Sequence, residues 1–282
     1  MKKLLISFSG GRTSGYMLWY LFNEWSERDQ WEKIVVFANT GKEAEKTLFF
    51  VDECSQEWNI PIIWVESERF SDDGELLSRK GYKTSHKVVT YETASRKGEP
   101  FEKMISVLGV PASGVPFCSN QLKTKPIESY LRSIGWNNYH KALGIRIDEP
   151  KRVNKNNDKV IYPFVDYPIT KQMVKEWWDK QSFDLDIHPD EGNCDNCWKK
   201  DFPRLARNML RNPKSFEWWE EMERKYGDFN PRDNDRVPPF NFYRENKSVL
   251  DIRKLAQMSQ AELKQLTMFD TLDGCAESCE AF

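Results

Sequence analysis

The residue run K-L-L-I-S-F-S-G-G-R-T-S-G, at positions 3–15, constrains the fold more than any other part of this 282-residue chain. A short apolar run is followed by small and polar residues and then by an apolar-periodic segment, a pattern typical of a strand, a tight loop and a helix. Two glycines allow a sharp turn, and the free N–H groups and positive dipole end of the helix favour an anion. The sequence therefore predicts a phosphate-binding loop here; a small-residue turn without a ligand is the alternative.

Further strands are predicted where the chain is continuously apolar and β-branched, at residues 33–38 and 60–65. Helical patterns at 13–27 and 44–58 separate these strands. Because strands and helices alternate, we expect an α/β fold with a doubly wound parallel sheet, which binds ligands at the carboxyl ends of its strands. The second strand also ends in a glycine turn, Asn39-Thr40-Gly41, so both glycine turns then lie on the same edge of the sheet.

The rest of the chain gives weaker signals. We expect another sheet strand at 139–145, and we interpret 66–100, which is rich in charges, as a solvated, mobile loop. Helical patterns at 202–210 and 215–226, and a capping box at 259–262, predict a helical C-terminal extension.

Composition excludes several classes of protein. The net charge is -2, so no overall basic field attracts nucleic acid. The apolar run at the start is too short for a signal peptide, and no later segment approaches a membrane span, so we expect a cytoplasmic protein. Six cysteines are too few for a disulfide scaffold, and in a reducing compartment spaced cysteines indicate a metal, a cluster or catalysis.

Five ordered motifs carry a family resemblance. S-G-G-R-T-S resembles the pyrophosphate loop (PP-loop) of the N-type ATP pyrophosphatases, with Arg12 and Thr13 where that superfamily usually has Lys and Asp. N-T-G-K-E-A-E-K-T, C-S-N-Q-L-K-T-K-P, a G-I-R turn and a C-x-x-C are similar to the further motifs of the phosphoadenylyl sulfate (PAPS) reductase family in that superfamily. Asn39 replaces the usual acid of the second motif. Together the motifs are more specific than any one alone.

The resemblance implies two units and a nucleotide site. Residues 1–200 would form a nucleotide-binding domain of PAPS reductase type, with an adenine nucleotide alpha hydrolase-like sheet, and 201–282 a helical extension with a cysteine-bearing tail. Lys123 and Arg146 would neutralise charge that develops at phosphorus or sulfur. The residues expected to bind ATP or an adenylyl sulfate are Ser7, Ser9, Gly10, Gly11, Arg12, Thr13, Ser14, Asn39, Thr40, Gly41 and Arg146.

Cysteine spacing indicates a metal centre. Cys118, which begins a predicted helix capped by Ser119, would join Cys194 and Cys197, and three soft thiolates suit an iron–sulfur cluster or zinc. The expected cluster is 4Fe-4S, with zinc as the alternative, and Cys275 is the expected fourth ligand. Other candidates for that position are Cys54, His188 and Cys279. A redox C-x-x-C, or core thiols without a ligand, is the structural alternative.

Two reactions and one non-catalytic role remain open. The first is ATP-dependent adenylation followed by sulfur transfer, with Mg²⁺ accompanying ATP. The second is reduction of a sulfonucleotide to sulfite by a tail thiol, Cys279. The tail lacks the family's E-C-G-[LI]-H motif, and this absence favours the first reaction. The third is a nucleotide-binding module with structural zinc. Expected partners are an adenine nucleotide and a sulfur donor or thiol reductant protein. The net charge gives no support for a nucleic-acid substrate. No membrane contact is expected, and a homodimer is an open alternative.

Overall fold

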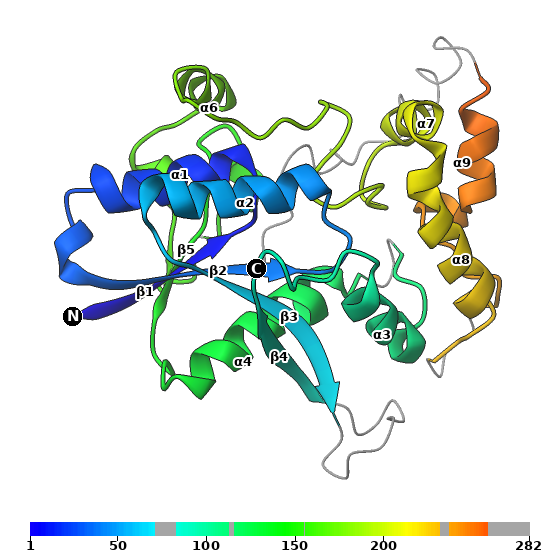
Figure 1. The fold of residues 1–282 in the computed structure, drawn as a ribbon, viewed down its shortest axis with the longest axis horizontal. Helices are drawn as coiled ribbons and strands as arrows, with labels where there is room; N and C mark the ends of the chain where they lie inside the picture. Colours follow the sequence, from blue (N-terminus) through cyan, green and yellow to red (C-terminus); the bar gives the residue numbers. More distant parts are fainter. Residues whose placement is uncertain (71–82, 113–115, 155, 232–236, 259–282) are drawn as a thin grey trace.

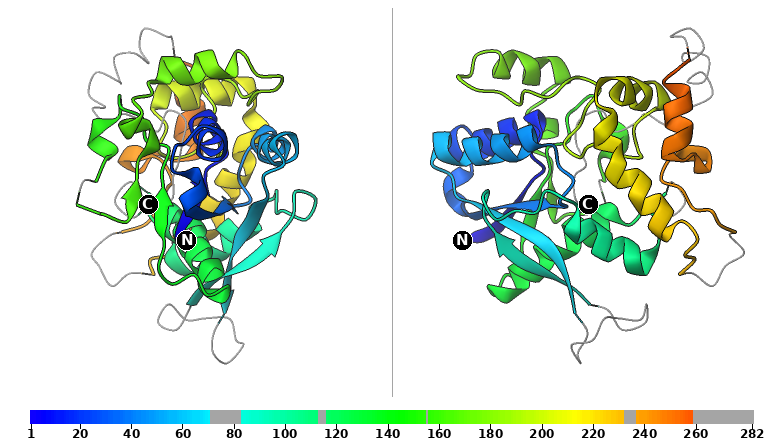
Figure 2. Two further views of the ribbon diagram at one scale, coloured as in Figure 1. Left: turned by 90° about the vertical axis from the view of Figure 1, so that its left-hand side faces the viewer. Right: turned by 45° about the vertical axis from the view of Figure 1, so that its right-hand side comes forward.

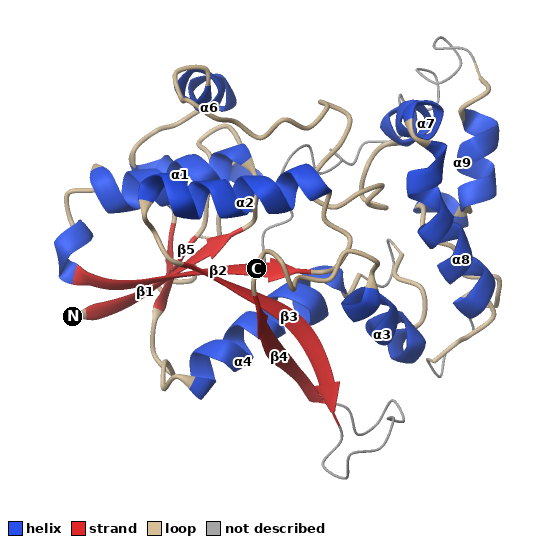
Figure 3. Ribbon diagram, in the orientation of Figure 1, coloured by secondary structure: helices blue, strands red, loops and turns tan. Residues whose placement is uncertain are grey.

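The computed structural model describes residues 1–70, 83–112, 116–154, 156–231 and 237–258. Its centre is a six-stranded sheet in the order β4-β3-β2-β1-β5-β6 (Figures 1 and 3). Every neighbouring pair is parallel except β3 and β4, which are antiparallel. The strands are β1 Lys2–Phe8, β2 Trp31–Asn39, β3 Ile62–Phe70, β4 Lys83–Val89, β5 His140–Ala142 and β6 Val160–Ile161. The α/β prediction, with a mostly parallel sheet, is confirmed.

Helices cover both faces of the sheet (Figure 2). Helices α1 (Arg12–Asn23) and α2 (Glu45–Trp58) lie on one face, and α4 (Lys125–Ser133) lies on the other. The chain moves outward from β1 to β3, then crosses back to β5 on the other side of β1, so the strand order reverses between β1 and β5. In open α/β sheets a ligand binds outside the carboxyl ends of the strands at such a reversal.

The remaining helices are α3 Glu99–Leu108, a π-helix Cys118–Thr124, α5 Pro163–Asp166, α6 Lys171–Trp178, α7 Phe202–Arg211, α8 Glu217–Tyr226, α9 Val249–Leu255, and 3₁₀ turns at Arg28–Gln30, Pro150–Arg152, Pro213–Phe216 and Arg244–Asn246.

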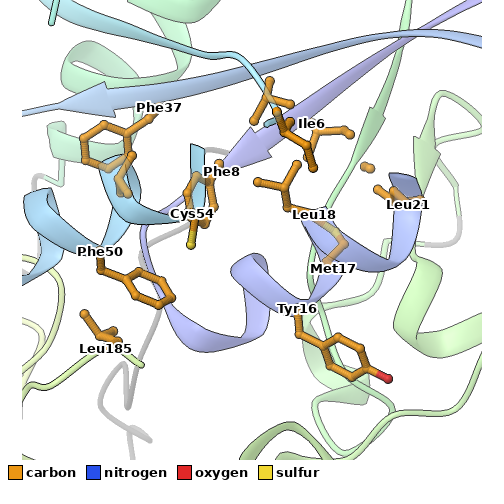
Figure 4. Close-up of a cluster of buried hydrophobic side chains, with 14 of the residues drawn as sticks. Ile6, Phe8, Tyr16, Met17, Leu18, Leu21, Phe37, Phe50, Cys54 and Leu185 are labelled. Atoms are coloured by element: carbon orange, nitrogen blue, oxygen red, sulfur yellow. The ribbon is translucent and has the colours of Figure 1, made fainter. Parts of the chain in front are cut away.

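The larger core lies between the sheet and α1 and α2 (Figure 4). Side chains of a strand alternate between faces, so Ile6 and Phe8 point into this core while Leu5 packs on the α4 side. Phe50 and Cys54 of α2 lie in this core on the side of the helices that cover the sheet. Burial raises the pKa of the Cys54 thiol well above its ordinary value, so this cysteine behaves as a small apolar residue.

A second core joins the C-terminal helices to the first 200 residues. Phe101 and Ile105 of α3 pack in the same cluster as Leu205 of α7, Trp219 of α8 and Ile252 of α9. Figure 1 shows these three helices side by side next to α3. The predicted helices at 202–210 and 215–226 are confirmed, and their apolar faces are buried in a cluster that they share with α3.

Several boundaries differ from the sequence prediction. The interpretation of 66–100 as a solvated loop is wrong for 66–70 and 83–89, which belong to β3 and β4. Strand β4 lies at the edge of the sheet and is mostly half-exposed and polar, so the apolar pattern of a buried strand is missing. The strand predicted at 139–145 shortens to β5. The predicted capping box at 259–262 lies outside the described residues.

In the described part of the chain, no helix is both long enough and apolar enough to cross a bilayer.

Candidate functional site

The predicted phosphate-binding loop connects β1 to α1. Gly10 has φ +76°, and a Cβ placed there would lie 2.8 Å from Thr47 Cγ2, so the turn needs glycine for both its backbone angle and its space. The hydroxyls of Ser9 and Ser14 lie 2.9 Å apart, and Ser14 Oγ also accepts from the Gly11 N–H at 3.2 Å. Gly11 is the N-cap of α1, whose first N–H groups have no partner within the helix. The sequence prediction of strand, tight turn and helix is confirmed at this junction.

The rim of this loop is tied to a segment far along the chain. Arg12 makes two hydrogen bonds to the carboxylate of Asp184, at 2.7 and 2.9 Å, and also donates to the Leu185 carbonyl. The indole N–H of Trp178 donates to the Arg12 carbonyl over 2.8 Å. The Arg12 guanidinium is therefore engaged at the outer edge of the loop, and Trp178 fixes the first turn of α1 from α6.

The second predicted motif forms a tight turn at the carboxyl end of β2. Asn39 is fully buried; its amide donates to Glu66 Oε1 at 2.7 Å and to the Ser95 carbonyl at 2.8 Å, and its oxygen accepts from the Gly41 N–H. Glu43 Oε2 accepts from the Thr40 N–H and hydroxyl. The side chain of Asn39 is thus occupied by protein partners, and this residue shapes the turn.

Cys118 and Lys123 lie on one π-helix, a rare form that is frequently found at functional sites. Pro126 follows two residues after this helix and has no N–H for a regular helical bond, and the Lys125 N–H reaches back to the Asn120 carbonyl. The helix begins at Cys118 with Phe117 as its N-cap, so the expectation that Ser119 is the capping residue is wrong. Lys123 is 6% exposed and its Nζ lies 3.5 Å from Glu43 Oε1.

Arg146 follows β5 and reaches the phosphate-binding loop. Its Nη1 donates to Thr13 Oγ1 at 3.1 Å, and its Nε donates to Asp148 Oδ1 at 2.9 Å. Nη2 lies 3.4 Å from Glu149 Oε2. Burial acts to raise the pKa of Asp148, but bonds from the Lys171 N–H and from Arg146 outweigh it and lower this pKa below its ordinary value. Arg146 is therefore a buried, fixed cation beside the first turn of α1.

The C-x-x-C segment packs directly on the two glycine turns. Asn193 Nδ2 donates to the Ser9 carbonyl at 2.8 Å, and the Asn193 carbonyl accepts from the Ala44 N–H at 2.9 Å. Cys194 forms an isolated antiparallel bridge with Glu43. Segments that are far apart in sequence, from β1, β2, the π-helix, β5 and residues 193–197, therefore meet at the carboxyl ends of the parallel strands.

Two buried lysines belong to this region, and the sequence prediction missed both. Lys42 is 7% exposed, with its Nζ 3.0 Å from Asp195 Oδ2 and above the ring of Trp218. Lys200 is 3% exposed and donates to the Cys194 carbonyl at 3.0 Å. Buried lysines are rare unless they are paired. The sequence signals that could have identified them are positional: one lysine lies inside the N-T-G-K-E motif, and the other lies three positions after Cys197.

The described cysteines do not all belong to the same core. Cys118 and Cys194 both flank the second core, whereas Cys54 lies in the first. Burial raises the pKa of Cys194 well above its ordinary value, and Glu43 adds to this effect. Within the described residues, no three His, Cys, Asp or Glu side chains form a group that could hold a metal ion. Cys275 and Cys279 lie outside the described residues.

The fold and these contacts define an α/β protein with a candidate anion-binding site at the carboxyl ends of a mostly parallel sheet. The "uncharacterized nin region protein ORF290" of Escherichia phage lambda is 31% identical to this chain over 290 residues, covering 99% of the chain and 94% of the phage protein. The chain therefore belongs to the same family as this nin region protein. No protein-family model and no solved structure matches it.

Proposed function

We propose that this protein is a PP-loop enzyme of the PAPS reductase type, which binds ATP or an adenylyl sulfate at residues 9–14. The observation that carries the proposal is the contact between Arg146 and Thr13, since it brings a buried guanidinium to the first turn of α1. A helix N-terminus with its free N–H groups already favours an anion, and Arg suits phosphate and sulfate because of its planar fork. Lys123 adds a second buried cation within the same set of contacting segments.

The proposed reaction is adenylation followed by sulfur transfer. An acceptor oxygen forms a bond to the α-phosphorus of ATP, the bond between the α- and β-phosphates breaks, and pyrophosphate leaves. A sulfur nucleophile from a donor then displaces AMP from the acceptor. The N–H groups of α1, with Arg146 and Lys123, would stabilise the negative charge that grows on the phosphate oxygens. Mg²⁺ accompanying ATP would neutralise part of the negative charge of the nucleotide.

The expected iron–sulfur cluster requires more than the described cysteines. Cys118, Cys194 and Cys197 do not form a metal-holding group in the described part of the chain, so the proposed reaction does not depend on a cluster. Some buried polar atoms nearby lack a hydrogen bond, among them Asn193 Oδ1 and the Tyr243 hydroxyl. A cluster or zinc that also uses Cys275 stays a prediction, which iron and zinc analysis of anaerobically purified protein tests.

The direct test is nucleotide binding by the full chain, purified without oxygen. We expect ATP or an adenylyl sulfate to bind, and Lys123→Met and Arg146→Met each to weaken binding at least tenfold. Lys125→Met is the matched control, since Lys125 lies two residues further on and its side chain takes no part in the contacts described above. Failure of ATP, adenylyl sulfate and PAPS to bind would overturn the proposal.

Product analysis then separates the reactions. Pyrophosphate release from ATP in the presence of a sulfur donor supports adenylation. Sulfite release from an adenylyl sulfate with a thiol reductant supports the reductase, in which Cys279 would be the nucleophile. Nucleotide binding with neither product, together with stoichiometric zinc, supports the non-catalytic module.

A further inference from the structure

A second candidate site lies away from the glycine turns, on the opposite face of the sheet. A cavity of about 440 Å³ opens between α4 and strands β5 and β6. Lys141 of β5 pairs in register with Leu5 of β1, which packs against α4, whereas the neighbouring Leu4 and Ile6 face α1. Lys141 is therefore on the α4 side. The volume falls in the range of small-molecule sites, and none of the residues that line the cavity belongs to the loop site described above.

Lys141 and Glu128 are opposite charges in this cavity that form no direct ion pair. Lys141 is half-buried, and burial lowers the pKa of its ammonium although the nearby Glu128 acts against this. Among the described residues, neither side chain makes a hydrogen bond or an ion pair with the protein. A half-buried ammonium that makes no hydrogen bond recovers only part of its lost hydration from a nearby carboxylate, so an anion in the cavity would be stabilised by it.

The loop before β6 adds hydrogen-bond donors. The amide oxygens of Asn154 and Asn157 each accept a backbone N–H at 3.1 Å, from Asn156 and Lys159 respectively. Both residues line the cavity, and their side-chain NH₂ groups have no hydrogen-bond partner among the described residues. The Tyr162 hydroxyl accepts from the Asn154 N–H at 3.0 Å, which leaves its own proton to donate. The cavity therefore presents an excess of donors.

We propose that this cavity binds a small molecule through a phosphate or sulfate group. The oxyanion would accept from the Lys141 ammonium and from the amide groups of Asn154 and Asn157, and Glu128 would accept from a hydroxyl or amine of the same molecule. Charge-assisted bonds of this kind are stronger than bonds between neutral groups. The proposal does not depend on nucleotide binding at residues 9–14.

The test is protection of Lys141 from acetylation, read by mass spectrometry on the full chain. Inorganic phosphate and inorganic sulfate are the probes, and sodium chloride at matched ionic strength is the control for screening. We expect either probe at about ten times its dissociation constant to lower Lys141 labelling roughly tenfold. Lys33, a half-buried lysine on β2 whose amine donates to the Arg28 carbonyl, should be labelled equally with and without the probes.

Variants separate this site from the loop site. Lys141→Gln should weaken phosphate binding in calorimetry at least tenfold, whereas Lys141→Arg should retain most of it, and Lys33→Gln should leave it unchanged. Arg146→Met, which alters the loop site, should leave phosphate protection of Lys141 intact. Equal labelling of Lys141 with phosphate, sulfate and chloride would overturn the proposal, as would protection that disappears in Arg146→Met.

Discussion

The side-chain amide of Asn193 donates a hydrogen bond to the carbonyl of Ser9, 184 residues earlier in the chain, over 2.8 Å. This bond joins the C-x-x-C segment to the turn that would hold phosphate. Asn193 is 4% exposed, so water cannot readily replace the lost partner if the amide is removed.

Asn193→Ala is therefore expected to lower the free energy of unfolding by about 1–3 kcal/mol, because the Ser9 carbonyl loses its side-chain donor. Nucleotide affinity should fall as well, since the turn loses a constraint. Chemical denaturation and nucleotide titration measure the two effects. Asn156→Ala, at an exposed position, should change neither. If both variants behave alike, the Asn193 bond does not stabilise the loop.

Gly10→Ala tests the turn itself. The added methyl group meets Thr47 and Val51 at 2.8 and 3.0 Å, and φ is +76°. Gly135 has the same φ with nothing within 4 Å of an added Cβ, so Gly135→Ala carries the backbone cost alone. We expect Gly10→Ala to destabilise the protein by about 1–3 kcal/mol more than Gly135→Ala, which is the usual cost of overpacking. Equal losses in denaturation would show that the contact with α2 relaxes freely.

Arg146→Lys keeps the charge but loses the planar fork that contacts Thr13, Asp148 and Glu149 at once. Since a lysine ammonium cannot span these partners, we expect nucleotide affinity to fall about tenfold or more. Titration with ATP measures the change. Arg253→Lys, which alters an exposed pair with Glu220, is the control and should have no effect. Wild-type affinity in Arg146→Lys would mean that charge alone suffices at this position.

Stability should depend on pH through Glu223 in α8. Burial raises the pKa of this carboxyl from 4.5 to about 7, although the Val249 and Phe242 N–H groups donate to it. Because this pKa is higher in the folded than in the unfolded state, the contribution of Glu223 to the free energy of unfolding is complete below pH 4.5. This contribution is lost as pH rises to about 7. The loss amounts to about 3 kcal/mol of unfolding free energy.

Denaturation at a series of pH values measures this slope. Glu223→Gln should flatten this slope between pH 5 and 7, whereas Glu221→Gln, at an exposed position two residues earlier in α8, should not. An unchanged slope in Glu223→Gln would assign the pH dependence to another group.

The sequence predicted the parts of the site that carry local signals. Gly10 and the apolar run before it specify the first junction by backbone sterics and periodicity. The sequence could not predict β4, because an edge strand needs no apolar face, nor the partners of Asn193 and Lys200, because these depend on how distant segments pack. Asn39 matched a motif position, yet its amide is used by Glu66 and Ser95, which only tertiary structure shows.

The shared core of α3 with α7, α8 and α9 has a consequence for shortened forms of the chain. A fragment ending near residue 200 would leave Phe101 and Ile105 facing water, and such a surface favours aggregation. Deleting the helices after position 201 would therefore yield insoluble protein. A shortened form that stays in solution would first need polar residues in place of the apolar ones along α3.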